Sequence, residues 1–155
     1  MTVRRVVDRP IHEVWAAVAD PAGHRLPLTT VQVPAAGLGV GARFVARTGL
    51  GPLRFADPMI VTRWSPPQRP GREPDAGPPA QVPAEAGYAV VKVGRVLTGW
   101  AQVQLQALDD RRTALVWTEH ICVKPSAIGP LLQPLTDRAV AAMFGRAVDA
   151  MLAAQ

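Results

Sequence analysis

A chain of 155 residues is long enough for one domain with a substantial core and too short for two domains of ordinary size. Its apolar fraction of 48% and charged fraction of 19% are typical of a globular protein and exclude an intrinsically disordered one. The net charge of +5 does not indicate a nucleic-acid partner, because the 17 basic residues are dispersed and are not interleaved with aromatic residues.

The first elements are a strand and a short helix. Val3–Asp8 is rich in β-branched residues and predicts a strand. Pro10 can open a helix because its missing N–H would have no intrahelical partner, and Ile11–Ala19 then has its apolar residues at helical spacing. Asp20 and Pro21 end this helix. Ala22–Leu28 is the place for a second short helical turn.

Further strands follow, separated by turn residues. They are expected at Thr29–Pro34, Ala42–Thr48, Phe55 or Met59 to Trp64, Tyr88–Leu97, Thr98–Leu108 and Thr113–Val123. The fifth of these alternates apolar residues with glutamines, which is typical of an antiparallel strand with one wet face. An apolar-periodic segment over Ile128–Ala154 predicts a long final helix.

A proline-rich segment, residues 66–87, interrupts the strands. It contains almost no large apolar side chains and cannot bury enough surface to offset the entropy of ordering it. Neither flank is self-sufficient, so we expect a mobile surface loop within a single domain that spans residues 1–155.

Targeting and redox features are few. No stretch approaches the roughly 20 consecutive apolar residues that cross a bilayer, so we expect no membrane span. Met1–Asp8 has no apolar run behind its arginines and is not typical of a secretory signal. The single cysteine, Cys122, excludes an intrachain disulfide and cannot form a zinc site by itself. We expect a cytoplasmic protein without a metal or another cofactor, and the sequence predicts no oligomeric state.

The order of elements predicts an α+β domain. Strands that are segregated from helices and joined by short turns indicate an antiparallel sheet of six to seven strands, with one or two short helices after the first strand. A sheet of that length twists and curls. The long C-terminal helix is the element able to cover its concave side.

This order resembles a known superfamily. Val3–Trp15 is similar to the opening of START-like, or Bet v 1-like, helix-grip proteins, whose bacterial branch is called the polyketide cyclase/dehydrase-like family (SRPBCC). Gly39–Phe44, Val61–Pro67 and Thr113–Glu119 resemble, in order, three further strands of that superfamily. The resemblance spans the whole chain and implies a ligand cavity between sheet and helix. It implies no particular reaction, because the superfamily includes cyclases, hydrolases, lipid carriers and receptors.

Two departures from the superfamily pattern lie near the expected cavity mouth. A tryptophan that is common a few residues after the His24 position is absent from Arg25–Leu28, and the proline-rich loop is longer than usual. For this reason the resemblance does not carry a ligand over to this chain.

Glu119 is the first candidate for chemistry. It shares one face of its strand with Leu115 and Trp117, while His120 and Cys122 lie on the other. A four-residue turn before the strand would turn the second face inward, and a three-residue turn with a bulge would turn the first inward. We favour the first, because it carries the larger apolar side chains. Burial beside Trp117 would then raise the pKa of Glu119 and make it an acid/base or an anchor for a polar ligand group; the alternative is a rim glutamate paired with an arginine.

Other candidates are weaker. His24 and His120 are candidates for proton transfer because histidine as a residue type suits that role, but neither has a sequence-local partner, so a structural or solvated role is the alternative. Gly37–Gly41 resembles a phosphate loop, yet it precedes a strand, whereas a dinucleotide site requires glycines that open a helix. Trp64 and Trp100 line the mouth or lie on the outer face, and the sequence does not decide between these.

The expected cavity is lined by inward side chains of the strands and of the long helix. These are Met59, Val61, Val103, Leu105, Leu115, Trp117, Glu119, Val140, Met143, Phe144 and Ala147. Small residues on the same faces leave volume unfilled, although small residues also allow close packing.

Three functions follow from this sequence. The first is binding of a hydrophobic small molecule that is polyketide-like, aromatic or lipid. The second is an aromatase/cyclase or dehydratase-type enzyme, with Glu119 or a histidine moving the proton. The third is a protein-interaction or chaperone-like module. An enzyme should have at least two polar groups converging in the cavity, whereas a carrier needs at most one.

Overall fold

The structure is a computed structural model that describes residues 1–23, 28–50, 53–68 and 84–124. These residues form seven strands and one helix. In chain order they are β1 (Thr2–Val7), α1 (Ile11–Val18), β2 (Thr29–Gln32), β3 (Arg43–Leu50), β4 (Leu53–Ser65), β5 (Glu85–Val93), β6 (Leu97–Ala107) and β7 (Thr113–Val123). The expected antiparallel sheet of up to seven strands is confirmed.

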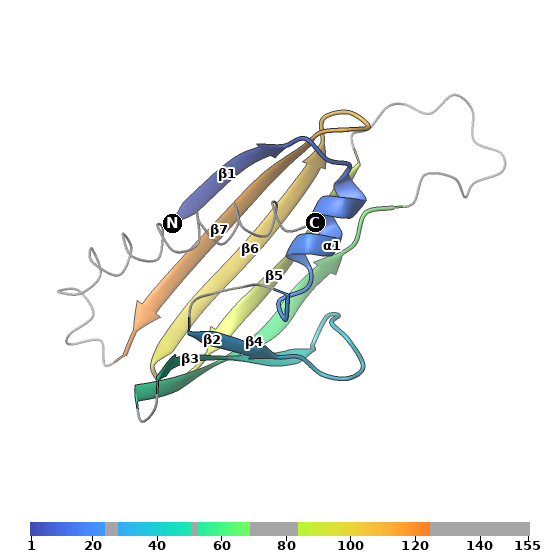
Figure 1. The fold of residues 1–155 in the computed structure, drawn as a ribbon. Helices are drawn as coiled ribbons and strands as arrows, with labels where there is room; N and C mark the ends of the chain where they lie inside the picture. Colours follow the sequence, from blue (N-terminus) through green and yellow to red (C-terminus); the bar gives the residue numbers. More distant parts are fainter. Residues whose placement is uncertain (24–27, 51–52, 69–83, 125–155) are drawn as a thin grey trace.

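The strands form a single curled sheet. Their order is β1-β7-β6-β5-β4-β3-β2, and every neighbouring pair is antiparallel. Apart from β1, each strand lies beside the strand that precedes or follows it in the chain, which is typical of hairpin-connected sheets. β2, β3 and β4 bend away from the other four strands, and α1 lies on the concave side (Figure 1). A register shift between Val61 and Arg63 marks an irregularity in β4, and such bulges increase the local twist.

Several parts of the prediction lie outside the described residues. They are the long helix expected over Ile128–Ala154, most of the proline-rich segment, and residues 24–27 of the second helical turn. Of the one or two short helices expected after the first strand, the described residues contain α1.

β5 begins earlier than predicted. Glu85, Ala86 and Gly87, which were assigned to the proline-rich segment, pair with Gln106, Leu105 and Gln104 of β6. Gly87 is suited to this place, because a Cβ atom there would lie 2.5 Å from the main-chain oxygen of Val103. The loop between β4 and β5 is therefore three residues shorter at its end than its composition suggested.

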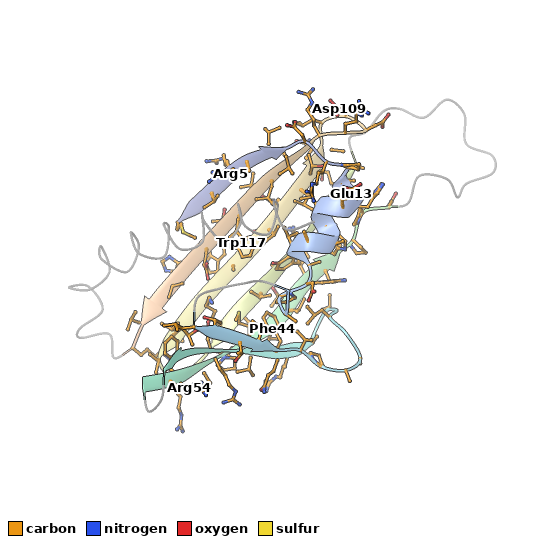
Figure 2. The ribbon with its side chains drawn as sticks, in the orientation of Figure 1. Arg5, Glu13, Phe44, Arg54, Asp109 and Trp117 are labelled. Atoms are coloured by element: carbon orange, nitrogen blue, oxygen red, sulfur yellow. The ribbon has the colours of Figure 1, made fainter. Side chains whose placement is uncertain are left out.

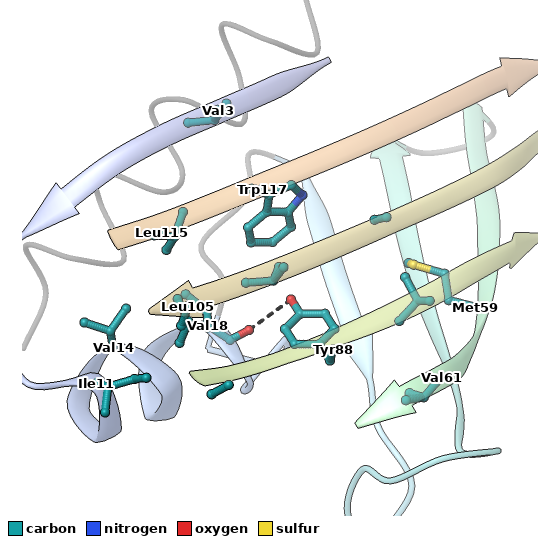
Figure 3. Close-up of a cluster of buried hydrophobic side chains, with 14 of the residues drawn as sticks. Val3, Ile11, Val14, Val18, Met59, Val61, Tyr88, Leu105, Leu115 and Trp117 are labelled. Carbon is teal, nitrogen blue, oxygen red and sulfur yellow. Dashed lines mark hydrogen bonds between the residues drawn. The ribbon is translucent and has the colours of Figure 1, made fainter. Parts of the chain in front are cut away.

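The core lies between α1 and the concave face of the sheet. Ile11, Val14 and Val18 form the buried stripe of α1, which packs against β5 and β6. The Tyr88 hydroxyl donates a hydrogen bond of 3.1 Å to the main-chain oxygen of Val18, so the end of α1 is fixed to β5 (Figure 3). The sheet contributes Leu115 and other buried apolar residues to the same cluster.

The β6–β7 hairpin determines which face of β7 is buried. The N–H groups of Leu108 and Asp109 both donate to the main-chain oxygen of Arg112, at 2.8 and 3.4 Å. Three residues remain between Leu108 and Arg112, and two residues of one strand face one of the other, as in a bulge. This register pairs Leu105 with Leu115 and directs Leu115, Trp117 and Glu119 inward, which is the alternative favoured from the sequence.

Charged side chains lie at both ends of the sheet. Arg54, near the start of β4, and Asp109, in the β6–β7 turn, lie at opposite ends of the molecule (Figure 2). Asp109 forms an exposed ion pair of 2.7 Å with Arg112, which braces the turn. Exposed pairs of this kind contribute little to stability, so the fold depends on its apolar core.

Candidate functional site

Three charged side chains meet on the concave face of the sheet. The Nζ atom of Lys92 lies 2.7 Å from Oδ2 of Asp57 and 3.2 Å from Oε1 of Glu119. Exposed fractions of 8% for Lys92, 5% for Asp57 and 3% for Glu119 show that all three are buried. We call Asp57, Lys92 and Glu119 the acid–lysine cluster. Buried charges are rare unless they are paired, and these are paired.

The sheet register brings the cluster together. Lys92 of β5 is opposite Met59 of β4, so Asp57, two residues earlier, faces the same side. Glu119 lies on β7, two strands away from β5, which is roughly 10 Å at ordinary strand spacing.

The strand between them, β6, carries almost no side chain where Lys92 crosses it. Its residues opposite Lys92 and Glu119 are Gly99 and Ala101. The long lysine side chain can therefore pass over β6 and reach Glu119.

The protonation states of the cluster depend on burial and on mutual attraction. Burial by itself lowers the pKa of Lys92, but attraction to Glu119 and Asp57 outweighs it, so this pKa lies above its ordinary value. Burial raises the pKa of Glu119, against the opposite effect of Lys92 and with a smaller contribution in the same direction from Asp57. Lys92 is thus held as an ammonium group, and Glu119 takes up a proton more readily than an exposed glutamate.

A small cavity of about 70 Å³ adjoins the cluster. The described residues that line it come from all six strands β2–β7 and from the segment after α1: Pro21, Val31, Phe44, Ala46, Met59, Tyr88, Val90, Lys92, Ala101, Trp117 and Glu119. Most of this lining is apolar.

Two carboxyl oxygens of the acid–lysine cluster lack a partner in the part of the chain that the structure describes. Oε2 of Glu119 and Oδ1 of Asp57 are buried and have no hydrogen-bond partner among the described residues. A buried oxygen without a partner is destabilising by about 1–3 kcal/mol, which a bound hydroxyl group or water would relieve.

The residues predicted to line a cavity divide into three groups. Met59, Trp117 and Glu119 line the 70 Å³ cavity. A second group is buried in the sheet's apolar cluster without lining it: Val61, Val103, Leu105 and Leu115. The third group lies outside the described residues: Val140, Met143, Phe144 and Ala147.

His120 and the two undecided tryptophans lie away from the cluster. His120 is exposed on the outer face, where its ring stacks on Trp100 at a centroid distance of 6.4 Å and its Nε2 lies 3.2 Å from Sγ of Cys122. Trp64 lies on the inner side, 5.0 Å from Trp15 between ring centroids. His24 lies outside the described residues.

Comparison of sequences finds no relative: no family model matches this chain, and neither does any curated protein. Comparison of structures finds proteins with a similar fold. A norcoclaurine synthase of Thalictrum flavum superposes with a TM-score of 0.60 at 12% identity, over 98% of this chain and 92% of the synthase. The Zhui aromatase/cyclase of Streptomyces sp. R1128 has a TM-score of 0.60 at 15% identity, over 97% and 92% of the two chains. Ara h 8.0201 has a TM-score of 0.55 at 11% identity, over 100% and 97%.

The chain has the Bet v 1-like, helix-grip fold. The resemblance seen in its sequence is confirmed at this level. At these identities the likeness extends to the fold alone, so the site of this helix-grip protein has to be interpreted from its own residues.

Lys92 and Asp57 were not among the site residues predicted from the sequence. Both were hidden in stretches assigned as ordinary strands. The available signal was alternation: Lys92 follows Ala86, Tyr88 and Val90 at every second position, so it continues an inward face. It is also one of two lysines in a chain whose other basic residues are arginines.

The described residues of this helix-grip sheet contain no group of three or more histidine, cysteine or acidic side chains arranged to hold a metal ion. They also contain no helix that is long and apolar enough to cross a bilayer.

Replacement of Glu119 by Gln should change how stability depends on pH. The folded-state pKa of Glu119 lies above its ordinary value of 4.5, so between these two values the folded protein binds more protons than the unfolded chain. The contribution of Glu119 to stability therefore falls as pH rises through this interval. We expect Glu119→Gln to match the wild type near the ordinary pKa and to gain relative stability above it. Thermal unfolding of both proteins from about pH 4 to pH 8 measures this, and a difference independent of pH would contradict it.

Proposed function

We propose that this protein binds a hydrophobic small molecule on the concave side of its sheet, with a polar group of the ligand at the acid–lysine cluster. One observation carries the proposal: a mostly apolar cavity is lined by Glu119, a buried carboxyl group with one oxygen that has no hydrogen-bond partner among the described residues. Ligand sites usually combine an apolar lining with a few placed polar groups. The ligand class is polyketide-like, aromatic or lipid.

The volume limits what this part of the site holds. About 70 Å³ is well below the 300–1,000 Å³ typical of ligand pockets, so the described residues accommodate one end of such a ligand. The end next to Lys92 and Glu119 is the polar one. The remainder of the ligand would lie along the predicted lining from the C-terminal segment, Val140, Met143, Phe144 and Ala147.

Native mass spectrometry of the protein purified from its own host tests this proposal. We expect a retained small molecule, and we expect Ala101→Leu to lose it, because the larger side chain fills the space beside Glu119. His120→Gln on the outer face is the matched control and should keep the ligand. Repeated absence of any ligand from the wild type, together with no binding of added apolar compounds, would contradict the proposal.

A second candidate function is catalysis, and a specific observation favours it. Two polar groups, Lys92 and Glu119, converge at the cavity, whereas a carrier requires at most one. A carboxyl group with a raised pKa beside a fixed ammonium group is suited to donate and accept a proton on a bound carbonyl compound. Two proteins with this fold are a synthase and an aromatase/cyclase by name. Once a substrate is identified, unchanged turnover by Glu119→Gln would exclude Glu119 as the acid/base.

A protein-interaction module receives less support. The exposed large apolar side chains of the described residues come from several separate loops and strands: Val6, Leu28, Val33, Val40, Val93, Val96, Trp100 and Leu108. Scattered apolar residues of this kind are ordinary on protein surfaces.

A further inference from the structure

The acid–lysine cluster restricts the charge of the ligand, an inference that rests on the proposed function. The ammonium group of Lys92 has three N–H donors, and three acceptors already surround it: Oδ2 of Asp57 at 2.7 Å, Oε1 of Glu119 at 3.2 Å and the sulfur of Met59 at 3.8 Å. No donor of this group is left for a bound anion. The amino group of Met1 is likewise engaged, with the main-chain oxygen of Glu119 at 2.8 Å.

Charge balance points in the same direction. One ammonium group faces two carboxyl groups, so the cluster has a net charge of −1 when both are ionised and of zero when Glu119 is protonated. It is not positive in either state. Among the described residues that line the cavity, a carboxylate or phosphate would meet neutral or negative charge in a region of low dielectric constant, where repulsion is strong.

Glu119 is one of the residues that line the cavity, and its Oε2 atom is buried and has no hydrogen-bond partner among the described residues. An ionised Glu119 offers a hydrogen-bond acceptor there, and a protonated one offers a donor. A hydroxyl group satisfies both states, because it can donate and accept. A carbonyl group satisfies only the protonated state, and an ammonium group only the ionised state.

We propose that the ligand contacts Glu119 through an uncharged hydroxyl group, and that the cavity excludes ligands whose polar end is a carboxylate or a phosphate. Fatty acids and phosphorylated lipids are then not ligands of this site. Alcohols and phenols with an apolar body are.

Three probes with the same apolar body test this: naphthylmethanol, naphthoate and naphthylmethylammonium. Dissociation constants are measured by fluorescence titration at neutral pH. We expect naphthylmethanol to bind at least about tenfold more tightly than naphthoate, and more tightly than the ammonium probe. Equal or tighter binding of naphthoate, or tightest binding of naphthylmethylammonium, overturns the inference and leaves the proposed function standing. Failure of all three probes to bind overturns both.

A charge reversal within the cluster makes the test sharper. In Asp57→Asn/Glu119→Gln both carboxyl groups become amides of similar shape, and Lys92 is left as an unopposed cation. We expect the order of naphthylmethanol and naphthoate to reverse in this variant, and its thermal unfolding is measured to confirm folding. If the double variant does not fold, Glu119→Gln alone must reduce the difference between the dissociation constants of naphthylmethanol and naphthoate. His120→Gln, on the outer face, must leave the ratio of these two dissociation constants unchanged. If that ratio is also unchanged in the variants of Asp57 and Glu119, the inference is contradicted.

Discussion

Lys92→Met should lower the free energy of unfolding by about 3–5 kcal/mol at neutral pH, because it leaves two buried carboxyl groups without their cation. Asp57 and Glu119 are 5% and 3% exposed, so water cannot replace the ammonium group. Methionine keeps most of the length of the lysine side chain, and the loss is therefore electrostatic and not a cavity effect. Urea unfolding monitored by tryptophan fluorescence measures the change.

Two further variants of this chain are the controls for Lys92→Met. Lys124→Met removes the other lysine, which is exposed, and should change stability by less than about 0.5 kcal/mol. The triple variant Asp57→Val/Lys92→Met/Glu119→Leu removes all charge from the cluster and should regain most of the loss, since apolar replacement of a buried ion pair is often neutral or stabilising. A Lys92→Met protein as stable as the wild type would mean that the three groups do not form a buried ionic cluster.

Gly99→Ala should be destabilising by roughly 2–6 kcal/mol, from strain and steric conflict together. The φ angle of Gly99 is +135°, a conformation that side chains other than glycine rarely adopt. A Cβ atom there would also collide with the main-chain oxygen of His120 on the neighbouring strand. β6 and β7 would have to separate, and the distance between Lys92 and Glu119 across β6 would increase.

Gly37→Ala is the matched control for this substitution. Gly37 also has a positive φ angle, +82°, but a Cβ atom there would meet no atom within 4 Å. Only the conformational part of the effect remains, about 1 kcal/mol. Urea unfolding of both variants distinguishes the two contributions, and equal losses would show that β6 and β7 are not in close contact at Gly99.

The sequence was sufficient for the architecture because each strand has a local signature. Alternation predicted the glutamine face of β6, and turn residues predicted the hairpins. The start of β5 was missed because Glu85, Ala86 and Gly87 have low strand propensity by themselves, and their pairing with β6 is a tertiary effect.

The site was harder to predict than the fold. Glu119 was found because it lies between large apolar residues on one face of β7. The cluster around it depends on β4, β5 and β7 at once, and on the absence of side chains at Gly99 in β6. The pairing of strands that are far apart in the sequence leaves no local pattern from which this cluster could be predicted. The face of β7 that is buried depends on the length of the turn before it. That length is set by the hydrogen bonds that the N–H groups of Leu108 and Asp109 donate to the main-chain oxygen of Arg112.

The pairing of β1 with β7 has a consequence for how the protein is made. The contacting atoms of Met1 and Glu119 belong to residues 118 positions apart, so the first strand of the sheet meets its partner last. At about 5–20 residues per second, a ribosome needs roughly 6–24 s to produce the intervening chain. During that time the edge of β1 is unpaired, and the exposed arginines Arg4 and Arg5 should discourage it from joining strands of other nascent chains. Folding is then expected to be late and slow, with closure of the sheet as its final cooperative step.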